Sequence, residues 1–240
     1  MPVTTQQYSR MKICELFEDL PRSACSELLA ESRPKDFASR DLIFVEGDPA
    51  KEALLLLSGR VKITQISRNG AEVILRLDLP GELIDELALE PGSTHYSTAQ
   101  AAGQDCSMLA WDVLTFEELS QRFPLLQRNR LRTIERRLQE LERRFCELSA
   151  MTVPRRVANM LLRLWNQIGH ESNGHHQIDI LQEEVAQMTA TTGSTVNRLL
   201  SDWEQQGLVC RRHGSIIIRS HSGMLQLCKG PGNLQNLAVT

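Results

Sequence analysis

Three polar side chains near the C-terminal end of the chain have types and spacing suited to reading the edges of bases. Ser194, Asn197 and Arg198 follow one another at helical spacing, on the face opposite to Val196 and Leu199. Arginine can bind O6 and N7 of guanine with two hydrogen bonds, and asparagine can pair in the same way with adenine. If such a helix lay in the major groove of DNA, it would present these side chains to the bases.

Neighbouring polar residues are suited to the phosphate backbone, which positions a protein on DNA without specifying sequence. Hydroxyl groups lie at the start of the predicted helix, and two arginines follow it. For each of these residues the alternative is a solvated side chain without a ligand. The candidate DNA contacts are Thr192, Ser194, Thr195, Asn197, Arg198, Arg211 and Arg212.

The surrounding pattern supplies the elements that would position these contacts. Helices are expected over 182–188 and 192–206, and Gly207 ends the second one. Short strands at 208–210 and 215–218 can pair across the basic turn between them. A helix, a turn, a helix and a hairpin together predict a winged helix-turn-helix. An amphipathic helix precedes it, and the polar segment 170–177 between them is expected to be a loop with solvated histidines.

A heptad pattern runs through the middle of the chain, from residue 131 to residue 148. Apolar residues alternate at steps of three and four, and arginine and glutamate fill the positions between them. A stripe this narrow suits pairing with a second copy of the same helix, and the alternative is one helix of a bundle. The predicted dimer contacts are Leu131, Ile134, Leu138, Leu141, Phe145 and Leu148.

The N-terminal half is a series of short apolar runs separated by glycine-containing turns. Asn69-Gly70 is the clearest hairpin signal, because both central residues of a type I′ turn need positive φ. Many short strands with regular turns predict a sandwich or a small barrel. Strands are expected at 42–45, 53–57, 61–65, 72–77, 96–101 and 106–111.

Composition sets limits on what the protein does. The 240 residues carry a net charge of −3, so any nucleic-acid surface must be local. The six cysteines form no CxxC pair, which indicates reduced thiols in a cytosolic protein. The N-terminus lacks the apolar core of a signal peptide, and no run of about 18 apolar residues predicts a membrane span. We find no nucleophile–base pair, phosphate loop or metal cluster, so an enzyme is not expected.

In this order of elements, the chain resembles the CRP/FNR superfamily of bacterial transcription regulators. The resemblance covers roughly residues 12–225. It implies an α+β fold with an N-terminal β-roll sensor domain, which is cupin-like and cyclic-nucleotide-binding-like, at 12–123. A dimerisation helix at 124–151, a winged helix-turn-helix at 152–225 and a tail at 226–240 would follow. The motifs that carry it are 44–48 (FVEGD), 57–63 (LSGRVKI), 80–82 (PGE), 86–87 (EL), 184–186 (EVA), 195–200 (TVNRLL) and 206–209 (QGLV).

The resemblance implies a homodimeric, cytoplasmic regulator that binds double-stranded DNA, with RNA polymerase and a small-molecule effector as further partners. Two recognition helices on a two-fold axis predict a palindromic site with half-site centres about 34 Å apart. The cyclic-AMP branch carries an Arg-Glu pair where this chain has Gly193-Ser194, so the half-site cannot be copied from it. The alternative is a metabolite-binding regulatory subunit that does not read DNA specifically.

The expected effector site also departs from the resemblance. In the cyclic-nucleotide branch, a Gly-Glu-Leu run holds the ribose and an Arg-Ser pair binds the phosphate. Here the first run reads Asp85-Glu86-Leu87, whose aspartate would repel a phosphate, and the second site lacks the arginine. These changes argue against cyclic AMP. The cysteine spacing likewise does not match the iron–sulfur cluster of the oxygen-sensing branch.

The cofactor is therefore left unknown by the sequence. His95 is a candidate haem ligand, because the segment from 94 to 101 is similar to the oxygen-sensing and nitric-oxide-responsive branches. The alternative is a surface or hydrogen-bonded histidine in a loop. No metal site is predicted elsewhere. The candidate effector pocket consists of Glu86, Leu87, His95, Tyr96 and Thr98.

Overall fold

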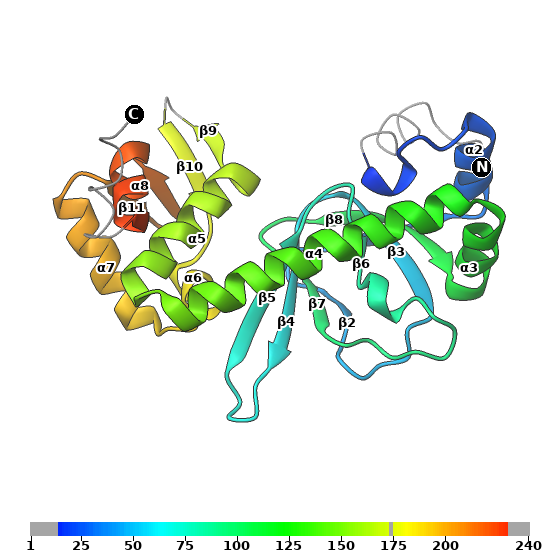
Figure 1. Ribbon diagram of the computed structural model, residues 1–240, viewed down its shortest axis with the longest axis horizontal. Helices are drawn as coiled ribbons and strands as arrows, with labels where there is room; N and C mark the ends of the chain where they lie inside the picture. The colour runs from blue at the N-terminus through cyan, green and yellow to red at the C-terminus, as the bar shows by residue number, and fades with distance from the viewer. Residues whose placement is uncertain (1–13, 173–174, 230–240) are drawn as a thin grey trace, which may run out of the picture. The chain divides into compact units, whose positions relative to one another are not determined.

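The computed structural model of the chain describes residues 14–172 and 175–229, and it divides into two compact units (Figure 1). The division falls between Leu141 and Glu142, within the long helix α4 (Pro124–Ala150). The residues expected to form the outermost N-terminus and most of the tail lie outside the described residues. None of the described helices is long and apolar enough to cross a membrane.

The first unit contains two four-stranded antiparallel sheets. One has the strand order β1-β8-β3-β6 and the other β2-β7-β4-β5. The six strands expected from the sequence are confirmed, although β7 starts two residues late. The strands are β1 (Arg33–Phe37), β2 (Leu42–Phe44), β3 (Glu52–Ser58), β4 (Val61–Ile66), β5 (Glu72–Asp78), β6 (Leu83–Ile84), β7 (Thr98–Ala101) and β8 (Cys106–Asp112).

The apolar run in β3 is explained by burial on both faces of its sheet. Leu54 and Leu56 pack in the core between the two sheets, whereas Ala53 and Leu55 face the core beneath the helices. That second core is covered by η1 (Glu15–Phe17), α2 (Arg22–Ala30) and α3 (Val113–Arg122). A strand covered on both sides reads as a continuous hydrophobic run and not as an alternating one. Trp111 anchors this core, donating from Nε1 to the carbonyl of Leu28 over 2.6 Å.

The β4–β5 hairpin is formed as predicted, but its turn is not of type I′. Of its two expected central residues only Gly70 has positive φ, at 83°. The connection is longer than two residues, because the Ser67 N–H donates to Ala71 O at 2.9 Å and closes a five-residue loop. The prediction of a two-residue turn was therefore wrong. The φ requirement falls on Gly70 alone, as in hairpins with longer loops.

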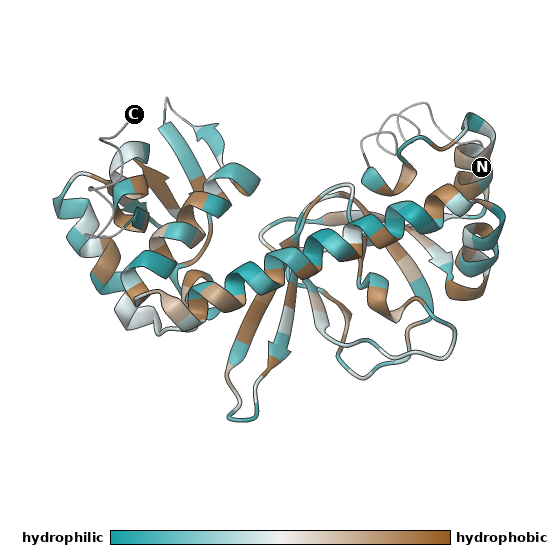
Figure 2. Cartoon of the chain, viewed as in Figure 1, coloured by the Kyte–Doolittle hydropathy of each residue, from teal (hydrophilic) through white to brown (hydrophobic). Residues whose placement is uncertain are grey.

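Helix α4 has two different faces. Leu126, Asn129 and Thr133 are buried against the first unit, and Asn129 Nδ2 donates to the carbonyls of Leu16 and Glu18. Figure 2 shows hydrophobic bands alternating with hydrophilic ones along this helix. Apart from Ile134, which is half-buried, the heptad residues are exposed. The exposed ones are Leu131, Leu138, Leu141, Phe145 and Leu148.

The second unit is a winged helix-turn-helix, as predicted. Its elements are α5 (Val153–Ile168), β9 (His170–Ser172), β10 (His175–Asp179), α6 (Gln182–Met188), α7 (Gly193–Gln205), β11 (Val209–Arg212), β12 (Ser215–Ile218) and α8 (His221–Lys229). The four strands form one antiparallel sheet in the order β11-β12-β10-β9. Helix α8 was not expected from the sequence.

The expected polar loop at 170–177 is instead the antiparallel pair β9 and β10, so that prediction was wrong. Strand β10 pairs with β12, where Ile178 lies opposite Ile216 and both are buried. His176 is not a freely solvated side chain, because its ring centroid lies 4.4 Å from that of Trp165. Pairing with a distant strand, and not local apolar alternation, makes this segment a strand.

Candidate nucleic-acid interface and sensor site

Helix α7 begins with a side-chain cap. Thr192 has extended backbone dihedrals, and its Oγ1 accepts a hydrogen bond from the Thr195 N–H at 3.2 Å. The same hydroxyl lies 2.9 Å from the hydroxyls of Ser194 and Thr195. Threonine is a preferred cap because it satisfies one of the unpaired N–H groups of the first turn. The three predicted hydroxyl contacts therefore form one cluster at the start of α7.

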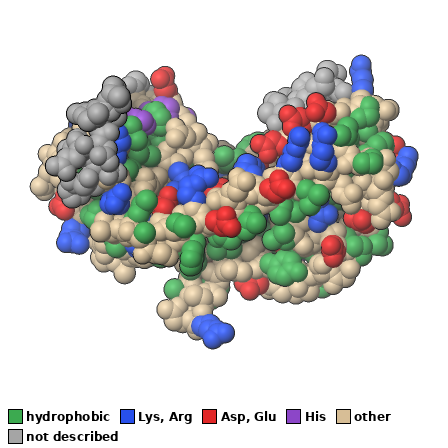
Figure 3. Space-filling model, in the orientation of Figure 1, with side chains coloured by type: hydrophobic (Ala, Val, Ile, Leu, Met, Phe, Trp, Pro, Cys, Tyr) green, Lys and Arg blue, Asp and Glu red, His purple; other side chains and the backbone are tan. Residues whose placement is uncertain are grey.

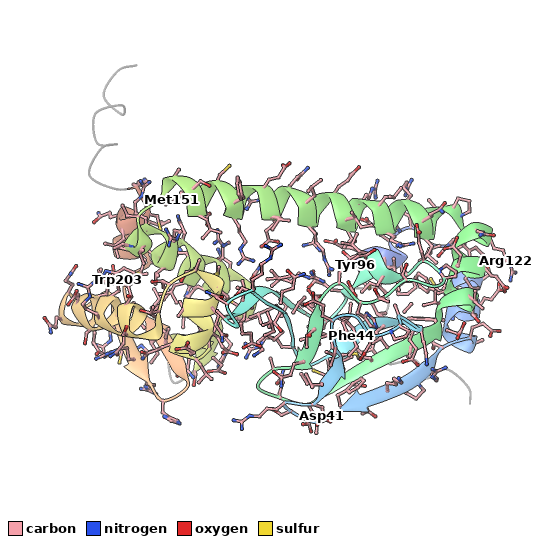
Figure 4. All side chains as sticks on the ribbon, turned by 90° about the horizontal axis from the view of Figure 1, so that it is seen from below. Asp41, Phe44, Tyr96, Arg122, Met151 and Trp203 are labelled. Carbon is pink, nitrogen blue, oxygen red and sulfur yellow. The ribbon has the colours of Figure 1, made fainter. Side chains whose placement is uncertain are left out.

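The two faces of α7 match the helical periodicity of the sequence. Val196, Leu199, Leu200 and Trp203 are buried, and Trp203 is labelled in Figure 4. The side chains of Ser194, Asn197 and Arg198 are exposed. The structure thus brings the three candidate base readers together on the open face of one helix.

Gly193, in the first turn of α7, lies close to the exposed side chain of Glu183. A Cβ atom added at Gly193 would lie 2.2 Å from Oε2 of Glu183, on α6. Any larger side chain would have to push this carboxylate aside. The Glu183 carboxylate thus lies near the first turn of α7, where the helix dipole favours a negative charge.

The two wing arginines have different surroundings. Arg211 donates from its backbone N–H and from Nε to the two carboxylate oxygens of Glu204, at 2.8 and 2.9 Å, and from Nη1 to Asn197 Oδ1 at 2.8 Å. Its neighbour Arg212 is exposed. The sequence placed both arginines in the turn between two strands, whereas both lie in β11. Arg211 instead ties β11 to α7.

Glu204 was not singled out in the sequence, although it holds the wing. Hydrogen bonds from the backbone N–H and the guanidinium of Arg211 lower the pKa of Glu204 below its usual value. Glu204 lies seven residues after Asn197, hence two turns further along the same face of α7. That spacing is its only sequence signal, since the partner lies on another element.

In the first unit, the long helix reaches into a buried polar cluster. Arg137 of α4 contacts the Glu86 carboxylate, donates to Leu83 O at 3.1 Å and lies 3.5 Å from Asp78. Arg76 pairs with Asp78 at 2.7 Å. Burial raises the pKa of Glu86 above its usual value, although the charge of Arg137 opposes the shift. Only Glu86 of this cluster was singled out from the sequence.

His95 belongs to a second buried pair. Its Nδ1 lies 2.8 Å from Oδ2 of Asp85, and its ring stacks on Phe44 with centroids 3.6 Å apart. Phe44 is labelled in Figure 4. Of the roles considered for His95, the structure gives it that of a hydrogen-bonded histidine. One ring nitrogen and one ring face already have protein partners, so a haem iron would have to be bound through the other ring nitrogen, Nε2.

The remaining candidate effector residues have different surroundings. Leu87 and Tyr96 are exposed, by 58% and 56%. Thr98 accepts a hydrogen bond from the Glu46 N–H at 3.1 Å. A cavity of about 220 Å³ lies between α4 and the β5–β6 turn, lined by Glu82, Glu86, Arg130 and other residues.

The described cysteines and histidines form no metal-binding group together with acidic residues. Cys14, Cys25 and Cys106 are buried, and Cys106 Sγ lies 3.2 Å from the carbonyl of Arg60. Burial is the main reason why the pKa of the Cys106 thiol is raised. These thiols serve as small core residues.

Comparisons with known proteins agree with this architecture. A model of the cyclic nucleotide-binding domain matches residues 34–123, and a model of the Crp-like helix-turn-helix domain matches residues 155–227. The chain is 29% identical over 218 residues to the CRP-like cAMP-activated global transcriptional regulator of Mycobacterium tuberculosis, covering 88% of this chain and 94% of that protein. It is 28% identical over 221 residues to the Cyclic AMP receptor protein of Thermus thermophilus, covering 92% and 99%.

Solved structures show the same fold. FixK2 from Bradyrhizobium japonicum superposes with a TM-score of 0.71 at 21% identity, over 82% of this chain and 96% of that chain. The regulator CLP from Xanthomonas campestris gives a TM-score of 0.74 at 19% identity, over 83% and 100%.

The two domains and the polar face of α7 define a DNA-binding transcription regulator with an effector-sensing domain, and not an enzyme. The chain belongs to the CRP/FNR superfamily. The comparisons do not support the alternative of a metabolite-binding subunit that no longer reads DNA.

Proposed function

We propose that this regulator works in the cytoplasm as a homodimer that places two α7 helices in the major groove of a palindromic duplex. The observation that supports this most is the exposure of Ser194, Asn197 and Arg198 on one face of a capped helix. Arg198 and Ser194 would contact base edges, and Thr192, Thr195 and Arg212 would lie near phosphates. Arg211 would not contact DNA itself. It would hold Asn197 in position through its hydrogen bonds with Glu204 and Asn197.

The exposed heptad residues of α4 support the homodimer. Phe145 is 68% exposed and Leu141 is 59% exposed, which is unusual for large apolar side chains spaced along a seam. Figure 3 shows hydrophobic side chains lying between charged ones over this helix. A second copy of α4 would bury these residues as the knobs of a coiled coil. The dimer would set the spacing of the two half-sites at about 34 Å.

We also propose domain boundaries at 123/124 and 151/152, with the roll as the sensor and α4 as the element that carries its signal. Arg137 supports this role, because it joins α4 to Glu86 and Asp78 in the roll. A signal that changes this cluster would bias the two states of the dimer by its different affinity for them. RNA polymerase would be the further partner of a regulator bound at a promoter.

The relatives from M. tuberculosis and T. thermophilus are named for cyclic AMP. We propose that cyclic AMP does not bind this roll in the expected way. Asp85 places a buried carboxylate beside the run that would hold the ribose, and His95 is already its partner. Isothermal titration with cyclic AMP is expected to give no heat of binding up to about millimolar concentration. Micromolar binding would contradict this part of the proposal.

The DNA-binding proposal is tested by replacing Arg198 with alanine. Selection from a random duplex library first identifies the operator, and fluorescence anisotropy then gives the affinity at several salt concentrations. Arg198→Ala is expected to cost about 1–3 kcal/mol of specific binding, the worth of one bidentate base contact. Arg68→Ala, which removes an exposed arginine from the first unit, is the matched control. Equal affinities for Arg198→Ala and the unaltered protein would contradict the assignment.

A further inference from the structure

The wing and the recognition helix are joined by a chain of charged and polar groups. Glu204 accepts two hydrogen bonds from Arg211, one from its backbone N–H at 2.8 Å and one from Nε at 2.9 Å. Two bonds to one carboxylate fix the position of the arginine. Nη1 of the same guanidinium donates to Asn197 Oδ1 at 2.8 Å. Arg211 thus lies between the wing and one of the residues on the open face of α7.

This contact determines which way the side-chain amide of Asn197 is turned. A guanidinium carries only hydrogen-bond donors, so it can be matched only by the amide oxygen and not by the amide nitrogen. Turning the amide over would place two donor groups against each other. Oδ1 is therefore directed towards Arg211, and Nδ2 makes no hydrogen bond with the described residues. Asn197 offers DNA an NH2 group.

We propose that Arg211 is a specificity-determining residue that makes Asn197 a reader of bases with acceptor-only edges. In the major groove guanine presents N7 and O6, and thymine presents O4, whereas adenine and cytosine each present an amine donor. A free Asn side chain would favour adenine, because its oxygen can accept from the adenine amine while its nitrogen donates to N7. With the oxygen turned towards Arg211, the two-bond pairing with adenine is weakened, and guanine or thymine is preferred.

The inference deepens the proposed function and rests on it, since it needs α7 to lie in the major groove. It differs from the expectation drawn from residue types alone, in which asparagine reads adenine. It also gives Arg211 a role other than a phosphate contact. Arg211 would act through Asn197, so it is a positioning residue and touches no base itself.

The test is a base preference, which a merely structural role would not move. Operators are selected from a random duplex library, once by the full chain and once by Asn197→Ala. The position at which the base preference disappears in Asn197→Ala is the one that Asn197 contacts. At that position the full chain is expected to prefer guanine or thymine over adenine by about five-fold or more. In Arg211→Met, which keeps the stem but removes the donors, the amide can turn and adenine should become at least as good.

Arg212→Met is the matched control, because it removes an exposed arginine from the neighbouring position of the wing. It is expected to weaken binding to all sequences alike and to lower the salt dependence.

The inference alone would be overturned by a preference for adenine or cytosine in the full chain, by no preference at any position that depends on Asn197, or by an unchanged preference in Arg211→Met. Absence of any salt-dependent binding to duplex DNA, even at low salt, would overturn the proposed function as well. Thermal unfolding of each variant shows whether it is folded.

Discussion

Two cysteines illustrate how burial sets the reactivity of a single residue. Cys14 is buried, and its pKa is raised to about 12, chiefly because burial disfavours the thiolate. Cys146 is an exposed residue of α4. The thiolate is the reactive form, so the two side chains should differ strongly.

We predict that iodoacetamide at pH 8 alkylates Cys146 in the native protein and leaves Cys14 unmodified, as measured by mass spectrometry of peptides. In urea both should react. Burial raises the pKa of Cys14 from the ordinary thiol value of 9.0 to about 12 in the folded state. Its contribution to stability is therefore complete below pH 9 and is lost as the pH rises towards about 12. Equal labelling of the two residues in the native protein would contradict this assignment.

Two glycines in the roll allow the cost of a positive φ to be separated from the cost of a steric clash. Gly59 has φ of 95°, and a Cβ added there would lie 2.6 Å from both Asp105 O and Cys106 Sγ. Gly47 has φ of 89°, but no atom lies within 4 Å of an added Cβ.

We expect Gly47→Ala to cost about 1–2 kcal/mol of unfolding free energy, the strain of a left-handed residue with a side chain. Gly59→Ala carries the same strain and also a clash with backbone, so its cost should be larger by about 1–3 kcal/mol. Urea unfolding followed by tryptophan fluorescence measures both, because Trp111 lies in the core of the first unit. Equal costs would show that the clash is relieved by a small shift.

At the residue scale, periodicity predicted which side chains are exposed but not which groups they meet. The open face of α7 follows from the 3.6-residue repeat of its buried residues. The turn of the Asn197 amide depends on Arg211, which reaches it from a strand paired to another part of the sheet. The approach of Glu183 to Gly193 is equally non-local. No spacing in the sequence encodes contacts of this kind.

At the scale of elements, the start of α7 depends on one hydroxyl. Thr192 caps the helix that carries all the candidate base readers. Thr192→Ala is expected to lower the local stability of α7 by about 1 kcal/mol, whereas Thr192→Ser keeps the capping oxygen and should cost less. Hydrogen exchange of the α7 amides measures the difference directly, and Thr191→Ala is the control in the preceding turn. Unchanged exchange in Thr192→Ala would show that the cap contributes nothing.

The elements that sequence reasoning missed have a common physical cause. Strand β1 carries Pro34 and charged residues, and it lies at the edge of its sheet beside β8. Strands β9 and β10 are polar, and β10 is a strand because it pairs with β12. By contrast, β3, β4 and α4 carry their own apolar pattern and were predicted. Tertiary pairing overrides local preference most easily in short polar segments.

At the scale of the whole molecule, the two sides of α4 differ. One side is hydrogen-bonded to the first unit, and the other is exposed and available to a second copy of the chain. Asn129 and Arg137 tie it to the first unit through hydrogen bonds to Leu16, Glu18 and Leu83. Its heptad residues remain exposed in the single chain. A helix whose one side is bound to a sensor and whose other side is free for a second copy can couple a signal to the arrangement of a dimer.

The last prediction concerns that free side. Replacing Leu138 and Leu141 with glutamate is expected to produce monomers, because like charges would face each other across the seam and two buried leucines, each worth about 1.5–3 kcal/mol, would be lost. Glutamate is a good helix former, so circular dichroism should be unchanged.

Leu114→Glu is the matched control, since Leu114 is 61% exposed on α3 and lies outside the heptad. Sedimentation velocity should show dimers for this control and monomers for the double variant. The monomer should also bind a palindromic duplex far more weakly, because linking two modules raises avidity by about 10²–10⁴. Dimers that persist in the double variant would mean that another surface joins the two copies.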